Sequence, residues 1–155
     1  MAQKLAAIVV AVILSVPSFG QKRDTSRTYM EGIPKNSVYG ELGGNALFGS
    51  ISYERILALN EKTAFAPRAG LGFWEAPVVL IELDFLFGGK HSFEAGPGFS
   101  VLPAAEASVF TFRAGYRFMG RKGLLIRLAP LFWMGISDGE AHPMAHAGLS
   151  VGYSF

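Results

Sequence analysis

The sequence contains no cysteine, carries little net charge and has few charged residues. The lack of cysteine excludes disulfides, thiolate metal sites, a cysteine nucleophile and lipidation on cysteine. The formal net charge is +2, so no strong field of one sign points to nucleic acid as a partner. Charged residues make up 17%, below the roughly 25% of ordinary soluble proteins. The chain has 155 residues, enough for one domain.

Long apolar runs are also missing, apart from one near the N-terminus. Leu5 to Val16 reads LAAIVVAVILSV, with Lys4 before it and the small residues Ser18 and Gly20 after it. This run is short for a transmembrane helix of about 20 residues and has the layout of a secretory signal peptide. We predict a signal peptide over residues 1–20, cleaved near Gly20, with a retained membrane anchor as the alternative. Residues 21–36 are polar and predict a flexible lead-in.

From Ser37 onward, apolar and polar residues alternate with a period of two, which is typical of strands with one apolar face. In residues 110–118, Phe, Phe, Ala, Tyr and Phe alternate with Thr, Arg, Gly and Arg. Turn signals separate eight such segments: 37–44, 47–56, 64–74, 79–88, 92–101, 110–118, 124–134 and 145–155. A membrane strand needs only about 9–11 residues with every second one apolar. Residues 37–155 therefore predict an all-β domain, an eight-stranded antiparallel up-and-down transmembrane β-barrel.

The predicted connections alternate between the two ends of the barrel. With the N-terminus on the periplasmic side, the inner turns are 58–63, 88–91 and 120–123. The outer loops are near 44–45, 75–77, 103–107 and 137–143, and all of them are short. Aromatic residues gather near both sets of strand ends, as in the girdles of membrane barrels, although the alternation turns Trp74 and Trp133 inward.

Volume decides which face lies inside. Eight apolar faces rich in Phe, Leu and Ile would overfill an eight-stranded barrel, whose interior is just wide enough for side chains. The other face has many Gly and Ser residues and nearly balanced charges, so we expect it inside, with the apolar face toward lipid. The alternatives are a partly hydrated channel and a secreted soluble barrel that binds a small apolar ligand. The predicted interior ion-pair network consists of Glu41, Glu54, Arg68, Glu82, Asp84, Glu94, Arg113, Arg117 and Arg127, with His146 as an optional further base.

Strand order suggests partners within this network, because buried charges must be paired. Arg68 would lie between Glu54 and the pair formed by Glu82 and Asp84. Arg113 and Arg117 would neighbour Glu94. The network predicts a plugged core rather than an open pore.

The signal peptide, the eight amphipathic strands and a last strand that ends in Phe155 resemble small eight-stranded outer-membrane β-barrels of Gram-negative bacteria. The stretches VYGELGG (38–44) and SISYERIL (50–57) also resemble the opening hairpin of uncharacterised Bacteroidetes-type outer-membrane barrels. The resemblance implies a monomer in the outer membrane, in contact with its lipid and lipopolysaccharide. It also implies the barrel-assembly machinery as a partner during biogenesis. The assembly signal that this machinery would recognise consists of Leu149, Val151, Tyr153 and Phe155.

Residues 148–152 spell G-x-S-x-G, the pattern of the serine-hydrolase nucleophile elbow. An elbow needs a helix after the serine, and none is predicted, so we interpret Ser150 as an inward-facing strand residue. Some barrels of the resembling fold act on lipid A as acyl hydrolases or acyltransferases, which makes His146, Ser150 and Glu140 an alternative catalytic set. Four residues along a strand span about 13 Å, too far for a hydrogen bond between His146 and Ser150. We predict no catalysis, and a structural or binding role through the short outer loops.

No metal or cofactor site is predicted. His142 and His146 have the i, i+4 spacing of ligands on a helix, but on a strand they would be about 13 Å apart. Residues 138–140 read Asp-Gly-Glu, which is more typical of an acidic turn than of a calcium site.

Overall fold

The computed structural model describes residues 33–74, 76–102, 107–120, 122–137 and 140–155. The predicted signal peptide and residues 21–32 of the predicted lead-in lie outside the described residues. The strands are β1 (Asn36–Leu42), β2 (Gly49–Arg55), β3 (Leu57–Ala58), β4 (Thr63–Trp74), β5 (Ala76–Gly88), β6 (His91–Leu102), β7 (Ala107–Met119), β8 (Leu124–Ser137) and β9 (Glu140–Ser154). A short 3-10 helix, η2 (Gly44–Ala46), joins β1 to β2. Within the described part of the chain, no helix is long and apolar enough to cross a membrane.

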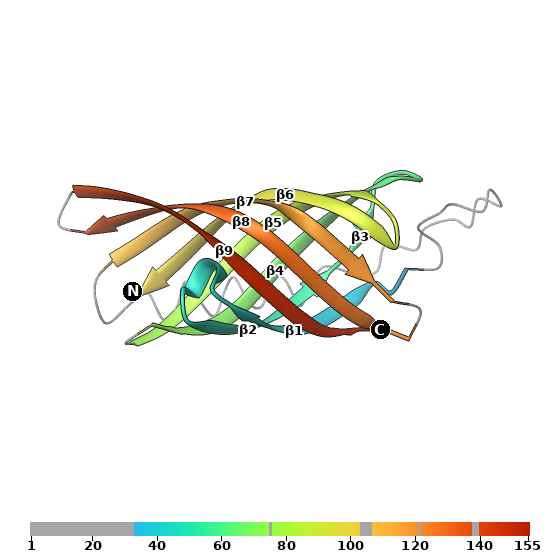
Figure 1. Cartoon of the computed structure of the whole chain (residues 1–155), viewed down its shortest axis with the longest axis horizontal. Helices are drawn as coiled ribbons and strands as arrows, with labels where there is room; N and C mark the ends of the chain where they lie inside the picture. The colour runs from blue at the N-terminus through green and yellow to red at the C-terminus, as the bar shows by residue number, and fades with distance from the viewer. Residues whose placement is uncertain (1–32, 75, 103–106, 121, 138–139) are drawn as a thin grey trace.

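The strands form a closed antiparallel barrel in which each strand pairs with its neighbours in sequence. Closure comes from β1 and β9, which pair from Ser37 opposite Ser154 to Leu42 opposite Leu149. β3 continues β2 beyond Ile56, and both pair with β4. The barrel therefore has eight strands and one two-residue extension, and Figure 1 shows them strongly tilted around a common axis. The predicted all-β, eight-stranded antiparallel barrel is confirmed.

All eight predicted strands are present, but two predicted outer loops are mostly strand. β5 begins at Ala76, with Pro77 opposite Phe73, and β9 begins at Glu140, with His142 opposite Gly135. The connections fall within the predicted loop ranges 75–77 and 137–143, but the strands extend further into these ranges than predicted. Pro77 and Pro143 were turn signals in the sequence, yet both are exposed residues near strand ends, where a missing N–H costs little.

Buried and exposed positions alternate along most of each long strand, except at the start of β9, where residues 140–145 are all exposed. Large side chains on the outer face are exposed, for example Leu71 (67%), Phe73 (60%) and Tyr153 (57%). The inward positions of the same strands are buried, for example Arg68 and Ser154. The volume argument placed the polar face inside, and the structure has that arrangement.

Two apolar layers close the interior at its ends, a feature that the sequence pattern did not predict. The layer at the end where β1 begins and β9 ends contains Tyr39, Ile56, Ala64, Ala66, Leu86, Met119 and Leu125, with Ile33 packed against it. The layer at the opposite end contains Ala46, Val78, Leu80, Leu102, Val109 and Trp133, with Leu47 and Ala107 packed against it. The inward orientation predicted for Trp133 is observed, and the side chain of Trp74 lies outside the described part. The predicted ion-pair network occupies the space between these layers.

Gly115 shows how closely the strands approach one another. A Cβ on this residue would lie 2.6 Å from the Cα of Ala129 and 2.7 Å from the carbonyl oxygen of Leu128. The β7–β8 pairing is interrupted beside it, where Pro130 has no N–H to donate. Glycine at position 115 lets the two strands pack where one ladder bond is missing.

Candidate functional site

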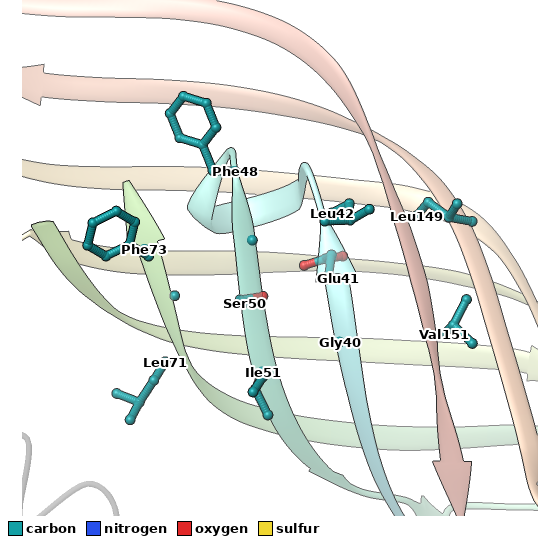
Figure 2. A pocket seen from close by; sticks show the side chains of 12 residues that line it. Gly40, Glu41, Leu42, Phe48, Ser50, Ile51, Leu71, Phe73, Leu149 and Val151 are labelled. Atoms are coloured by element: carbon teal, nitrogen blue, oxygen red, sulfur yellow. The ribbon is translucent and has the colours of Figure 1, made fainter. Parts of the chain in front are cut away.

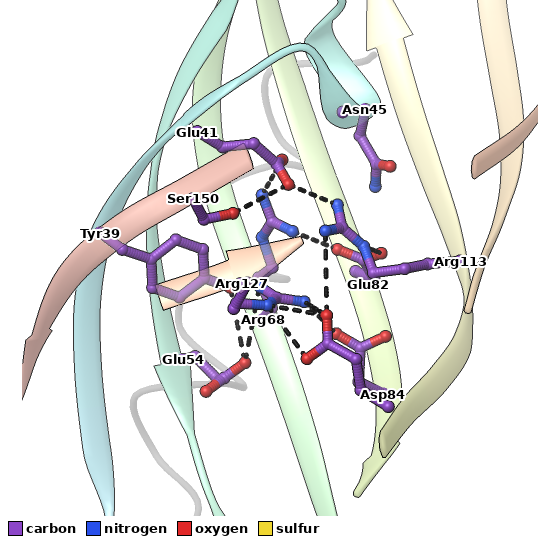
Figure 3. A network of polar contacts seen from close by, with 12 residues as sticks. Tyr39, Glu41, Asn45, Glu54, Arg68, Glu82, Asp84, Arg113, Arg127 and Ser150 are labelled. Atoms are coloured by element: carbon purple, nitrogen blue, oxygen red, sulfur yellow. Dashed lines mark hydrogen bonds and ion pairs between the residues drawn. The ribbon is translucent and has the colours of Figure 1, made fainter. Parts of the chain in front are cut away.

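The structure places all nine predicted network residues inside the barrel, with side chains that are 0% exposed. They project from seven of the strands because each occupies an inward position of the two-residue repeat. Figure 3 shows most of them converging on the barrel axis. Burying so many charges is costly unless each is paired and hydrogen-bonded. Their pairing therefore decides what this interior can do.

Four of these residues form a closed ring of alternating charge near η2, here called the plug-side group: Glu41, Arg68, Glu82 and Arg113. Glu41 makes an ion pair of 2.6 Å to each arginine, one through each carboxylate oxygen. Glu82 bonds the same two arginines, and its distance to Nε of Arg113 is 2.6 Å. Ser150 Oγ donates a 3.1 Å hydrogen bond to Oε1 of Glu41. Each charge in this ring has two partners of opposite sign.

The other five form the terminus-side group: Glu54, Asp84, Glu94, Arg117 and Arg127. Arg117 donates to both oxygens of Glu54, at 2.6 and 2.5 Å, and through Nε to Glu94 at 2.8 Å. Arg127 donates through Nε to Glu94 and through Nη2 to Asp84, the latter at 2.9 Å. The bidentate geometry of Arg117 on Glu54 is the strong form of such a pair.

Tyr39 connects the two groups, and the sequence prediction did not include it. Its hydroxyl accepts a hydrogen bond from Nη1 of Arg127 and donates one of 3.4 Å to Glu54. The guanidinium carbons of Arg68 and Arg127 lie 5.1 and 4.9 Å from the centroid of its ring. Each arginine is therefore close enough for a cation–π contact, which is strongest away from water. The alternation puts Tyr39 inside, but the pattern alone cannot show that it contacts both groups.

The partners agree only in part with those that strand order suggested. Arg68 pairs with Glu82 as predicted, but its second partner is Glu41 and not Glu54, which lies opposite it in the β2–β4 register. Arg113 also pairs with Glu41 and Glu82, and its distance to Glu94 is 4.0 Å. Guanidinium groups reach across the lumen, so the neighbouring strand does not determine the partner. The predicted pair of Arg117 with Glu94 is observed.

The network holds five carboxyl groups but only four guanidinium groups. Asp84 is the least well matched acid, because Oδ2 pairs with Arg127 while Oδ1 has no hydrogen-bond partner. The other four acids each contact at least two arginines. The extra acidic group is therefore Asp84.

The connection between β1 and β2 turns into the lumen and acts as a plug. The sequence predicted a simple outer turn near 44–45, but Gly44, Asn45 and Ala46 are buried. Gly43 and Gly44 have φ values of 71° and 72°, a region that glycine enters without a steric penalty. Leu47 is the one described non-glycine residue with positive φ, at 59°, which indicates local backbone strain.

Contacts from three strands hold this plug. His146 donates from Nε2 to the carbonyl oxygen of Gly44 at 2.8 Å. Ser100 Oγ donates to the carbonyl oxygen of Asn45 at 3.4 Å. Ala46 packs into the apolar layer that includes Leu80. The plug therefore completes the end of the barrel that lies opposite the start of β1 and the end of β9.

The alternative catalytic residues do not form a catalytic unit. Ser150 is buried and bonds Glu41, whereas His146 bonds the plug. Glu140 and His142 are exposed at the start of β9. Among the described residues, no group of three or more His, Cys, Asp or Glu side chains could hold a metal ion. Asp138 lies outside the described residues.

The outer wall contains an apolar hollow of about 760 Å³ over β1, β2, β4 and β9. Figure 2 shows Leu42, Phe48, Phe73 and Leu149 around it. These side chains are exposed, so the hollow opens away from the lumen. Its lining suits hydrocarbon, and Leu149 and Val151 of the predicted assembly signal contribute to it.

No protein-family model, no curated protein and no solved structure matches this chain.

Proposed function

We propose that this chain is an outer-membrane β-barrel of a Gram-negative bacterium, which spans the lipid bilayer as a closed, non-catalytic scaffold. One observation carries the proposal: nine charged side chains are fully buried inside while the large apolar side chains face outward. Soluble monomers rarely expose contiguous apolar patches beyond a few hundred Å², and larger patches mark contacts with membranes or partners. Around this barrel the apolar surface lies on every long strand, which fits a surrounding lipid phase better than one partner.

Strand length supports the same proposal. β4 to β9 contain 12 to 15 residues each, more than the roughly 9–11 that a tilted membrane strand requires. The signal peptide expected at 1–20 supplies a route out of the cytoplasm. The Bacteroidetes-type origin and the recognition of Leu149, Val151, Tyr153 and Phe155 by the assembly machinery stay predictions from the sequence.

The interior supports a scaffold rather than a channel or a carrier. A small apolar ligand would need a dry apolar cavity, but the middle of this lumen is filled by the ion-pair network. An apolar layer lies on either side of that network. The lipid A enzyme is less well supported, because Ser150 is buried and its hydroxyl is engaged by Glu41. Binding would instead use the short connections at the end opposite the start of β1 and the end of β9.

Membrane fractionation with heat-modifiable gel migration tests this proposal. We expect the chain in the outer-membrane fraction, where it resists alkaline extraction. We also expect the unheated chain to migrate differently from the boiled chain, because a closed barrel stays folded in detergent. A chain found in the soluble periplasmic fraction, without a heat-dependent shift, would refute the proposal.

A further inference from the structure

One end of the barrel carries a ring of basic side chains, here called the basic collar: Lys35, Arg55, Lys62, Lys90 and Lys122. This is the end where β1 begins and β9 ends. The four lysines are exposed and Arg55 is half-buried. The described acidic side chain at this end is that of Glu61. Positive charge therefore dominates here.

Backbone hydrogen bonds place the basic collar around the rim in sequence. Ile56 N donates to the carbonyl of Lys35 at 2.7 Å, which brings the start of β1 against the end of β2. Gly88 N donates to the carbonyl of Lys62 at 2.7 Å, and Met119 N donates to that of Lys90 at 2.8 Å. Each of these hydrogen bonds joins the backbone of a basic-collar residue to the end of the strand next to it.

The last strand completes this ring. Ser154 N donates to the carbonyl of Gly123 at 2.7 Å, beside Lys122. Phe155 N donates to the carbonyl of Asn36 at 2.8 Å, beside Lys35. The basic residues thus follow one another around the whole circumference instead of gathering on one side.

An aromatic band lies on the outer wall next to the basic collar. Its ring pairs include Phe65 with Phe85 at 5.4 Å and Tyr153 with Phe155 at 6.4 Å between centroids. Lys90 Nζ lies 5.2 Å from the ring centroid of Phe118. Aromatic rings prefer the boundary between hydrocarbon and headgroups. The basic collar beyond this band therefore lies at the depth of the lipid phosphates.

The opposite end has the reverse composition. Sequence ranges 42–49, 73–78, 100–110 and 134–145, which include the connections at that end, contain no Lys or Arg. The same ranges contain Glu75, Glu106, Asp138 and Glu140. In sequence, the connections near the two ends of the barrel thus differ in the sign of their formal charge.

We propose that the basic collar binds the headgroups of anionic phospholipids in the leaflet on the terminus side. This inference rests on the proposed membrane function and adds a lipid partner to it. Lysine ammonium groups are compact point charges that suit the phosphates of several separate lipids. Lys and Arg side chains near the membrane surface are attracted to anionic lipids. This attraction adds up over the residues near the surface and falls off with distance within a Debye length. A ring of such residues selects anionic lipids around the whole barrel.

Lipid selectivity in vesicles tests this proposal. The chain, in the form that cells accumulate, is inserted into phosphatidylcholine vesicles that carry spin-labelled phosphatidylglycerol or spin-labelled phosphatidylcholine. Electron spin resonance then measures the fraction of each probe immobilised at the barrel surface. We expect phosphatidylglycerol to associate about fivefold more strongly, and this preference to disappear in about 1 M NaCl. Equal association of the two probes would overturn the proposal.

Two variants assign the effect to the basic collar. The variant with Lys35→Gln, Arg55→Gln, Lys62→Gln, Lys90→Gln and Lys122→Gln is expected to insert and to lose the preference. A control variant with Lys22→Gln and Arg23→Gln neutralises basic residues outside the basic collar and is expected to keep the preference. A collar variant that retains the preference would overturn the inference. A wild-type chain that fails to insert into any vesicle would refute the proposed membrane function instead, so the two failures are distinguishable.

Discussion

Arg127 donates a hydrogen bond to the hydroxyl of Tyr39, and its guanidinium carbon lies 4.9 Å from the centroid of the same ring. The hydroxyl in turn donates to Glu54, which Arg117 binds through both carboxylate oxygens. One phenol therefore connects two of the four buried arginines. Substitutions that remove single groups from this chain of contacts show how much the buried network contributes to the free energy of unfolding.

Tyr39→Phe removes the hydroxyl and keeps the ring. Because Nη1 of Arg127 loses its acceptor in a buried site, we expect the free energy of unfolding to fall by about 1–3 kcal/mol. Urea titration of the folded barrel in vesicles, followed by the heat-dependent gel shift, measures this change. Tyr53→Phe is the matched control, because its hydroxyl donates to Asn36 at a half-buried site. Equal stability of Tyr39→Phe and wild type would contradict the connecting role.

Asp84→Asn and Arg127→Met should differ strongly in their effect on the free energy of unfolding. Asp84 is the unmatched acid of the network, so we expect Asp84→Asn to change the free energy of unfolding by less than about 1 kcal/mol. Arg127→Met leaves Glu94 and Asp84 without a shared cation, at a cost of about 3–5 kcal/mol. The same urea titration ranks the two variants. A larger loss of stability for Asp84→Asn than for Arg127→Met would show that Asp84 is not the unmatched acid of the network.

Phe155→Ala tests the predicted assembly signal without removing backbone. The backbone of Phe155 makes two hydrogen bonds to Asn36 that help close the barrel, and its ring stacks on Tyr153. We expect the alanine variant to accumulate in the outer membrane at a several-fold lower level, yet to fold in vesicles like wild type. Deletion of Phe155 should impair both processes. Normal outer-membrane levels of Phe155→Ala would show that the aromatic ring is not part of the signal.

Ser150→Ala separates the scaffold from the lipid A enzyme. The substitution removes a 3.1 Å hydrogen bond to Glu41, so we expect a loss of about 1 kcal/mol in the free energy of unfolding. The acylation pattern of lipid A, measured by mass spectrometry, should be the same in cells that contain wild type, Ser150→Ala or no copy of the chain. A pattern that changes with wild type but not with Ser150→Ala would establish catalysis.

The sequence predicted the strands well because barrel strands depend on a local rule. Period-two alternation identifies a strand and its inward positions from neighbouring residues alone, as in 110–118. Contacts across the lumen obey no such rule. Arg68 on β4 reaches Glu41 on β1, two strands away, although its register partner on β2 is Glu54. The plug was missed for a related reason. Gly43, Gly44 and Asn45 have the composition of an ordinary turn, and the direction in which the loop folds depends on Ala46 fitting the apolar layer.

The two apolar layers have an electrical consequence. Ions need a continuous path of water or polar groups, and here a polar middle is enclosed between two hydrocarbon barriers. In a bilayer we therefore expect the lumen, as far as the described residues form it, to behave as an insulator with fixed internal charges and to carry no steady current.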